Sequence, residues 1–323
     1  MNLFVFLLFL LHIPWTIFAL RDRSGGSTAV NGVTYQLEKR LYVHENSNIK
    51  LRNGEVYKAC RKDNRQVCVA IKYSDLTRAN AQEQDVLEAL KGTKYTIKQF
   101  YAGVTTLSLT SRTFFRKMYT QVLELAEETL LTIKISSPEM VYSIWTQLLL
   151  GVEEMHCRRY VHNDLKLENV GLVRGTVKLM DFDVSFKMRE REQFATFKLP
   201  AYTPYYSMPP EKITPIKSGL FRVGPQADMW SLGMILYKLI YNKNAFDFVP
   251  EEKREQCVLS PDCVFPNLPL VFPDLEPLKN MALQCLRRGD SSRPTLKELI
   301  KETASILRSR RYSFPAAADL FQL

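Results

Sequence analysis

Hydrophobic positions along the chain follow a strand-like pattern in the first third and a helical spacing afterwards. Residues Val33–Glu124 are rich in β-formers, and the run Val67–Lys72 follows the polar turn Arg61–Gln66, which predicts a β-hairpin. Within this part, Asn80–Lys91 carries an apolar stripe at helical spacing. We therefore expect a β-rich segment interrupted by one helix.

Helical spacing dominates from Ser137 onward. The apolar positions there repeat every four residues: Met140, Ile144, Leu148 and Val152. The segment Ala227–Tyr241 is apolar on nearly all sides, which is typical of a buried helix, and Pro294–Leu307 is amphipathic. A small β-rich lobe followed by a larger helical lobe predicts an α+β fold with two lobes.

Residues 1–20 form a separate segment without charged side chains. An apolar run, a proline and then Ala19 predict a signal peptide. The alternative is a retained signal anchor. Because Arg21 and Arg23 follow the apolar run, the positive-inside rule would then leave the rest of the chain in the cytosol. The Ser- and Gly-containing stretch 21–32 predicts a flexible linker.

The composition is that of an ordinary globular protein. Of 323 residues, 46% are apolar and 24% charged, which excludes collagen-like, low-complexity and wholly disordered chains. The 44 basic and 34 acidic residues give a net charge of +10, which favours acidic partners, including an acidic protein substrate. We find no basic strip interleaved with aromatic residues, so we expect no nucleic-acid partner. We expect a monomer that meets a membrane only through residues 1–20, if these are retained.

Six cysteines are too few for a disulfide scaffold, yet they allow two or three bridges. Cys60 and Cys68 flank the predicted hairpin turn and share one face of it, so they can pair across the strands. Cys257 and Cys263 lie six residues apart in a loop and can also pair. The remaining two cysteines fall in helical context and are expected to be buried thiols. The alternative is six reduced cysteines in the cytosol.

Seven short motifs carry the candidate chemistry. In chain order they are Val69–Lys72, Glu83, His162–Asn169, Asp181–Asp183, Met208–Glu211, Asp228–Gly233 and Arg293–Pro294. Taken singly, Lys72 is explained as a surface lysine and Glu83 as a solvated helix residue. Asp164, Asn169 and Asp181 are not explained so simply, because polar residues beside apolar strands need partners.

The order and spacing of these motifs resemble the eukaryotic protein kinase family from about Val33 to Arg310. The resemblance implies a bilobal fold with an N-lobe at 33–124, a C-lobe at 125–311 and a tail at 312–323. It also implies ATP and Mg²⁺ or Mn²⁺ as cofactors, and a protein hydroxyl as the phosphate acceptor.

The resemblance gives the polar residues of the larger lobe their expected roles. Asp164 would orient the attacking hydroxyl. Lys166 would neutralise the γ-phosphate, and a lysine at that place looks like the serine/threonine type. Asn169 and Asp181 would hold the metal ions through oxygen atoms.

The smaller lobe would hold the nucleotide. Lys72, oriented by Glu83, would bind the α- and β-phosphates. The further contacts implied by the resemblance are Gly54, Val56, Ala70, Glu124 and Ala126, with Leu123 as gatekeeper.

Other motif residues are expected to be structural. They are His162 and Phe182 as packing residues, Asp228 as an anchor of the catalytic-loop backbone, and Glu211 with Arg293 as a buried pair.

Three departures from the family pattern bear on activity. Ile49 and Leu51 stand where phosphate-loop glycines are expected, within a stretch (Tyr42–Arg52) that looks like an insertion. Asn163 replaces the arginine that usually pairs with a phosphorylated activation loop, which suggests activation without that modification. Asp183 replaces a glycine and adds negative charge near the metal ligands.

Two functions therefore stand. One is a secreted or membrane-tethered ATP-dependent serine/threonine kinase, and the other is a pseudokinase scaffold that regulates a partner protein. Local details at Val30–Tyr35 and Met208–Glu211 resemble the monopolar-spindle kinases. The secretory location that the leader predicts resembles that of the secreted rhoptry-type kinases.

Overall fold

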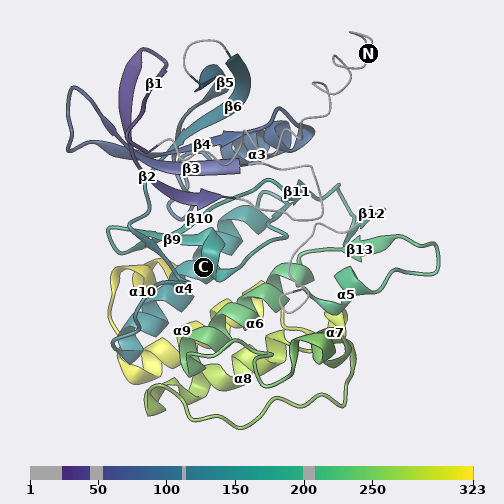
Figure 1. The fold of residues 1–323 in the computed structure, drawn as a ribbon. Helices are drawn as coiled ribbons and strands as arrows, with labels where there is room; N and C mark the ends of the chain where they lie inside the picture. Colours follow the sequence, from purple (N-terminus) through teal and green to yellow (C-terminus); the bar gives the residue numbers. More distant parts are fainter. Residues whose placement is uncertain (1–23, 44–53, 111–113, 199–207, 323) are drawn as a thin grey trace. The chain divides into compact units, whose positions relative to one another are not determined.

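The computed structural model describes residues 24–43, 54–110, 114–198 and 208–322 (Figure 1). They divide into two compact units. The first comprises residues up to Asn80 together with Lys98–Leu125, and the second comprises Ala81–Ile97 together with the chain from Ala126 onward. The boundary between Leu125 and Ala126 falls within the segment 124–126 that was predicted to contact adenine.

The first unit is an antiparallel six-stranded sheet with the strand order β1-β2-β3-β4-β6-β5. Its strands are β1 (Ser27–Val30), β2 (Val33–Val43), β3 (Gly54–Arg61), β4 (Cys68–Ser74), β5 (Gln99–Thr110) and β6 (Phe114–Leu123). The hairpin predicted from the run Val67–Lys72 is confirmed as β3–β4. Large side chains such as Tyr57, Ile71 and Tyr73 are buried on one side of the sheet.

The N-terminal stretch differs from its prediction. Residues 21–32 were expected to form a linker, but Ser27–Val30 is a strand that pairs with β2 in full register. Thr28 and Val30 alternate with exposed neighbours, so this strand buries every second side chain. The strand was not predicted because it is short and follows a Ser- and Gly-rich stretch that is typical of a linker.

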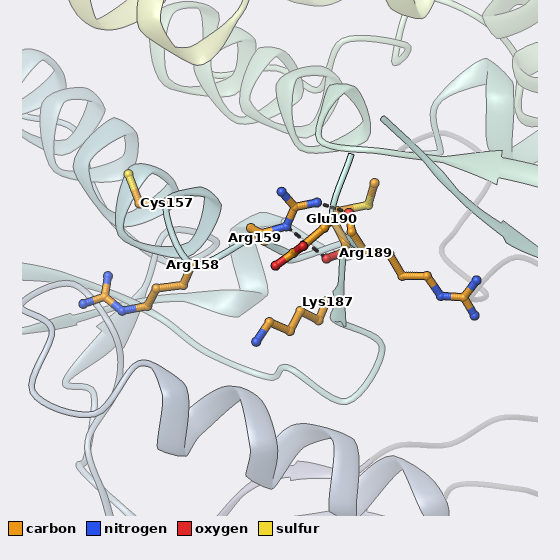
Figure 2. Close-up of a pocket in the computed structure, with 7 residues that line it drawn as sticks. Cys157, Arg158, Arg159, Lys187, Arg189 and Glu190 are labelled. Atoms are coloured by element: carbon orange, nitrogen blue, oxygen red, sulfur yellow. Dashed lines mark hydrogen bonds between the residues drawn. The ribbon is translucent and has the colours of Figure 1, made fainter. Parts of the chain in front are cut away.

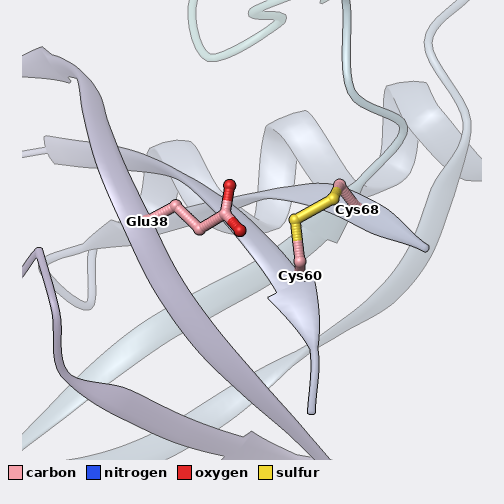
Figure 3. A group of neighbouring side chains, drawn as sticks. All are labelled: Glu38, Cys60 and Cys68. Carbon is pink, nitrogen blue, oxygen red and sulfur yellow. A yellow bond between two sulfur atoms is a disulfide. The ribbon is translucent and has the colours of Figure 1, made fainter. Parts of the chain in front are cut away.

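Cys60 and Cys68 form a disulfide across the β3–β4 hairpin (Figure 3). They are directly opposite each other in the register, with their Cα atoms 4.0 Å apart. Glu38 lies beside them and pairs with Lys58 at 3.0 Å. Because the two sulfur atoms are bonded to each other, this cluster offers no thiolate to a metal ion.

The second unit is mainly helical. Its helices are α3 (Arg78–Ala89, counted here from Ala81), α4 (Pro138–His156), α5 (Pro210–Ile213), α6 (Gln226–Tyr241), α7 (Glu251–Leu259), α8 (Glu276–Cys285), α9 (Leu296–Arg310) and α10 (Pro315–Leu320). Its strands are β7 (Glu128–Thr129), β8 (Tyr160–Val161), β9 (Val170–Val173), β10 (Thr176–Leu179), β11 (Phe186–Lys187), β12 (Ala195–Phe197) and β13 (Phe221–Val223).

The predicted helices are confirmed within a few residues at each end. Helix α4 begins after Ser137, whose side chain accepts the backbone N–H of Met140 at 3.2 Å. Helix α6 is buried on nearly all sides, as its all-round apolar pattern predicted, and it packs beside α8 (Figure 1).

The C-terminal segment also differs from its prediction. Residues 312–323 were expected to be a tail, but Pro315–Leu320 forms α10, with Ala316, Ala317 and Leu320 buried in the core. The Asp319 carboxylate accepts hydrogen bonds from Lys94 Nζ at 2.7 Å and from Tyr95 Oη at 2.9 Å. Buried apolar residues and the hydrogen bonds of the partly exposed Asp319 carboxylate thus fix this segment to the second unit.

The remaining cysteines divide into a second disulfide and two free thiols. Cys257 and Cys263 are bonded, and Arg288 Nη2 donates to the backbone oxygens of both, at 3.3 and 2.7 Å. Cys285 is buried as predicted, but Cys157 is exposed, which corrects its prediction as a buried thiol. Cys157 follows the last turn of α4, where the helix leaves the core.

Among the residues that the structure describes, we find no helix with both the length and the apolar character needed to cross a bilayer. The predicted leader, residues 1–20, lies outside the described residues.

Gly233 allows α6 to approach α8 closely, and this contact is testable. A Cβ at this position would lie 2.6 Å from Cys285 Cβ and 3.2 Å from the Ala282 carbonyl oxygen. Because this approach is closer than real Cβ contacts allow, Gly233→Ala is expected to cost about 2–3 kcal/mol in steric strain. After the gain of about 1 kcal/mol in helix propensity, the free energy of unfolding should fall by about 1–2 kcal/mol.

Urea unfolding followed by circular dichroism measures the change, with the exposed helical variant Ser305→Ala as control. Ser305→Ala should change stability by less than about 0.5 kcal/mol. Equal stability of Gly233→Ala and the unmodified protein would show that α6 and α8 do not pack this closely.

Candidate active site

The loop after β8 is anchored by one buried carboxylate. Asp228, in the first turn of α6, accepts the backbone N–H of His162 at 2.9 Å and that of Asn163 at 2.9 Å. His156 Nε2 lies 2.8 Å from the same carboxylate. The predicted role of Asp228 as the backbone anchor of this loop agrees with these contacts.

Asp228 is held in its ionised form. Burial disfavours the charge, but the hydrogen bond and charge of His156, the charge of His162 and the N–H of Asn163 outweigh it. The result is a pKa of Asp228 below its ordinary value. The loop is therefore held by charge-assisted hydrogen bonds, which are about twice as strong as neutral ones.

Three of the predicted residues meet at the end of this loop. Asp164 Oδ2 accepts hydrogen bonds from Lys166 Nζ at 2.8 Å and from Asn169 Nδ2 at 3.0 Å. Asn169 Nδ2 also donates to the Asp164 backbone oxygen at 2.9 Å. Asp164 and Asn169 are buried, so the carboxylate has a fixed orientation.

The lysine of this group remains charged. Burial acts to lower the pKa of Lys166, but the charges of Asp164, Asp181 and Glu168 and the hydrogen bond to Asp164 together raise it. A protonated Lys166 beside Asp164 supplies a cation that an incoming phosphate can meet.

Asp181 lies next to Asn169. The N–H of Met180, the preceding residue, donates to the Asn169 backbone oxygen at 2.9 Å, and the charge of Asp181 acts on Lys166. Asp181 has a φ of 62°, a left-handed conformation that few residues other than glycine adopt. Such strain persists where the surroundings fix it, which is common at active sites.

These residues fit a divalent cation. The amide nitrogen of Asn169 is occupied by Asp164, so its amide oxygen is the atom it can offer. Together with the Asp181 carboxylate it gives two hard oxygen donors, the ligand type that Mg²⁺ takes. The metal-binding roles of Asn169 and Asp181 stay predictions that this arrangement suits.

Asn163, in the place of the family's arginine, has a structural contact of its own. Its Nδ2 donates to the Val184 backbone oxygen at 2.9 Å, and its φ is 68°. Ser185 Oγ donates to the His162 backbone oxygen at 2.8 Å. The loop is thus tied directly to the segment that follows the half-buried Asp183.

The predicted packing residues are buried in the second unit. His162 and Phe182 are both 0% exposed, with ring centroids 5.2 Å apart. Arg293 forms a two-pronged pair with Glu211, at 2.7 Å and 2.8 Å. The pair fixes the short helix α5 to the chain before α9.

The predicted nucleotide contacts of the first unit lie on neighbouring strands. Lys72 on β4 is opposite Val56 on β3 and Gln121 on β6, and Ala70 is opposite Leu123. Gly54 begins β3, and the Glu124 N–H donates to the Lys98 oxygen at 2.8 Å. Ile49 and Leu51, on which the phosphate-loop argument depends, lie outside the described residues.

Glu83 belongs to the second unit and is only 2% exposed, so it is not a solvated helix residue. Its pairing with Lys72 stays a prediction. Ala126, predicted to contact adenine, also belongs to this unit.

Two residues near the site were missed from the sequence. A Cβ at Gly171 would lie 2.7 Å from Ala126 Cβ and 3.0 Å from Met180 Sδ, so only glycine fits there. A glycine inside a strand often marks such a close approach, and that signal was present. The other is Lys212, which is buried beneath the loop. Its type gave no signal, because lysines are mostly exposed.

A cavity of about 500 Å³ lies elsewhere, at the turn between α4 and β8 (Figure 2). Its lining is basic, but Arg158 and Arg189 point away from each other. Arg159 is engaged by the backbone oxygens of Met188 and Arg189. None of Asp164, Lys166, Asn169 and Asp181 lines this cavity, so it is not part of the candidate active site.

The protein kinase domain model matches residues 52–305, more than half of the chain. Combined with the two-lobe composition of strands and helices and the Asp164–Asn169 arrangement, this match shows that the chain belongs to the protein kinase family. Its members generally use ATP and Mg²⁺, and a protein kinase domain implies a protein substrate.

Several curated kinases are similar to the chain. The serine/threonine-protein kinase MPS1 of Encephalitozoon cuniculi is 31% identical over 176 residues, which cover 51% of this chain and 27% of that protein. MPS1 of Saccharomyces cerevisiae is 28% identical over 171 residues, with 49% and 22% covered. The mouse dual specificity protein kinase TTK is 28% identical over 166 residues, with 49% and 19% covered. The matches thus span about a quarter of these relatives' length. The predicted resemblance to the monopolar-spindle kinases is confirmed by these similarities.

The anchor at Asp228 generates a pH-dependent prediction. In Asp228→Asn an NH₂ group faces one of the two backbone N–H donors, and we expect a loss of about 1–3 kcal/mol of stability at pH 7. The folded protein lowers the pKa of Asp228, so its stabilising contribution is complete above the unfolded value near about 3.9. It is lost as the pH falls through the lower, folded value.

The stability difference between the unmodified protein and Asp228→Asn should therefore shrink below about pH 4. Urea unfolding between pH 7 and pH 3 measures it. The exposed Asp262→Asn serves as the matched control and should show little difference at any pH. A difference that does not depend on pH would contradict an ionised Asp228.

Proposed function

We propose that the protein is an ATP-dependent serine/threonine kinase that transfers the γ-phosphate of ATP to a protein hydroxyl. The observation that carries this proposal is the fixed carboxylate of Asp164, held by Lys166 and Asn169 at hydrogen-bond distance. A phosphotransfer site needs such positioning more than covalent chemistry.

Asp164 would accept or orient the proton of the attacking hydroxyl, because its carboxylate has a fixed orientation in a buried loop. Lys166 would offset the charge of the transferred phosphate from its position beside Asp164. Lysine at this place and the similarity to MPS1 proteins both favour serine and threonine as acceptors.

Asn169 and Asp181 would hold Mg²⁺ or Mn²⁺ through their oxygen atoms. When bound, the metal would neutralise charge on the nucleotide phosphates. Lys72 would hold the other phosphates, and the strand residues Val56 and Ala70 would line the adenine site.

The other candidate is a pseudokinase scaffold that regulates a partner protein. Asp183, in place of a glycine, favours it because a further negative charge beside the metal ligands opposes nucleotide phosphates. We favour catalysis because Asp164, Lys166, Asn169 and Asp181 are all present.

We also propose that residues 1–20 direct the chain to the secretory pathway, with a membrane-tethered form as the alternative. The two disulfides support this proposal, because disulfides persist mainly in oxidising compartments.

Catalysis is tested by phosphotransfer from labelled ATP to generic acidic and basic proteins, with Mg²⁺ or Mn²⁺. Asp164→Asn removes the group that accepts the hydroxyl proton, and we expect the rate to fall about 10²- to 10⁴-fold. Asp181→Asn should lower it comparably, whereas Asp262→Asn should leave it unchanged. Phosphoamino acid analysis identifies the acceptor hydroxyl.

Absence of phosphotransfer from the unmodified protein would sink the catalytic proposal. Thermal stabilisation by ATP in that case would favour a nucleotide-binding pseudokinase, since a ligand that binds only the folded state raises its stability.

Localisation is tested by expressing the full chain in eukaryotic cells and counting thiols under denaturing conditions. Before reduction, alkylation should label two of the six cysteines, Cys157 and Cys285, and after reduction all six. N-terminal sequencing of the exported protein should give a sequence that begins near Arg21.

Deletion of residues 1–20 is the control and should leave six reactive thiols. Six reactive thiols in the full chain would contradict export, and an uncleaved chain in the membrane fraction would favour the anchor.

A further inference from the structure

Lys212 is a lysine buried under the catalytic loop, on the short helix α5. It is 3% exposed, and the neighbouring Glu211 fixes the helix through its pair with Arg293. Burying an ammonium group without partners is costly, so a lysine in this place must be compensated by its neighbours.

Its neighbours are the residues of the loop and its anchor. Lys212 Nζ donates a hydrogen bond to the backbone oxygen of Asn163. The negative charges of Asp164, Asp228 and Glu211 favour its protonated form, and Lys166 opposes it. These groups face the ammonium from the catalytic loop, from α6 and from α5 itself.

Asn163 is consequently held on both sides of its backbone by buried charges of opposite sign. Its N–H donates to the Asp228 carboxylate at 2.9 Å, and its carbonyl oxygen accepts from Lys212. Asn163 is in the left-handed conformation, with a φ of 68°. The carbonyl belongs to the peptide unit that leads into Asp164, so the two contacts fix the direction in which Asp164 leaves the loop.

We propose that Lys212 is a positioning residue for phosphotransfer: with Asp228 it clamps the backbone of Asn163 and thereby orients Asp164. This inference rests on the proposed kinase activity. Lys212 is a fixed part of the fold, and its positive charge lies beneath a loop that has Asn163 in place of the usual arginine. The clamp needs no phosphorylated residue.

The clamp has a pH limit. Burial lowers the pKa of Lys212 to about 8, even though Asp164, Asp228 and Glu211 act to raise it. Above this pH the amine loses its charge, and the charge-assisted bond to Asn163 weakens.

The test compares Lys212→Met with Lys217→Met, which removes an exposed lysine from the loop after α5. Methionine has a similar volume and no charge, so it removes the cost of burying an ammonium group but leaves the Asn163 carbonyl oxygen without this donor. Urea unfolding of both variants measures the net change in stability, and kcat is measured where each variant is folded. For Lys212→Met we expect kcat to fall at least about tenfold, which corresponds to about 1.4 kcal/mol, with the KM for ATP little changed. In the unmodified protein we expect the rate to decline above about pH 8, as Lys212 loses its charge, and this decline should be absent in Lys212→Met.

Hydrogen exchange gives a readout that does not require activity. The amides of His162 and Asn163 donate to Asp228, so they are protected in the intact clamp. In Lys212→Met they should exchange at least about tenfold faster than the measured change in global stability accounts for, which corresponds to about 1.4 kcal/mol of local opening. Lys217→Met should change neither kcat nor exchange.

Unchanged kcat and unchanged exchange in Lys212→Met would overturn the proposal. If this variant does not fold, ¹³C-lysine NMR of the unmodified protein and Asp164→Asn decides. Loss of the Asp164 charge should lower the titration midpoint of Lys212, and an identical midpoint would overturn the proposal. If the unmodified protein shows no phosphotransfer, the proposed function fails, and hydrogen exchange alone decides whether Lys212 clamps the loop.

Discussion

The buried negative charge of Asp228 is the constraint on which the site depends. Burying a carboxylate in the first turn of a core helix is unfavourable unless donors surround it. Here the donors are two backbone N–H groups of the catalytic loop and a histidine from α4. The charge therefore connects the core helix α6 to the loop that presents Asp164. Apolar packing of α6 against α8 holds the carboxylate in place, so the geometry of the site depends on the packing of the core.

Much of the fold follows from local pattern. Helix α6 was predicted at Ala227–Tyr241, and the structure has it begin one residue earlier. The prediction succeeds because a segment that is apolar on all sides is stable only in the core. The misses were short elements. Ser27–Val30 and Pro315–Leu320 are too short for their periodicity to be recognised. Ser27–Val30 pairs with the strand that follows it, whereas Pro315–Leu320 packs on α4, far away in the sequence.

The site could be predicted in part, because Asp164, Lys166 and Asn169 are close in sequence and their spacing places them together. Lys212 could not be found in this way. Its contact joins residues 49 positions apart, and nothing about an isolated lysine distinguishes a buried ammonium from a surface one. Gly171 was visible as a glycine in a strand, but the side chains that approach it were not.

The exposed Cys157 has a consequence for how the protein behaves outside a reducing environment. Burial and the hydrogen bond from its thiol to Glu153 at 3.2 Å raise the pKa of Cys157 above its ordinary value. Disulfide exchange proceeds through the thiolate, so at neutral pH this sulfur reacts slowly despite its exposure. The carboxylate of Glu153 thus acts as chemical protection, and two molecules that meet through this surface are slow to become covalently linked.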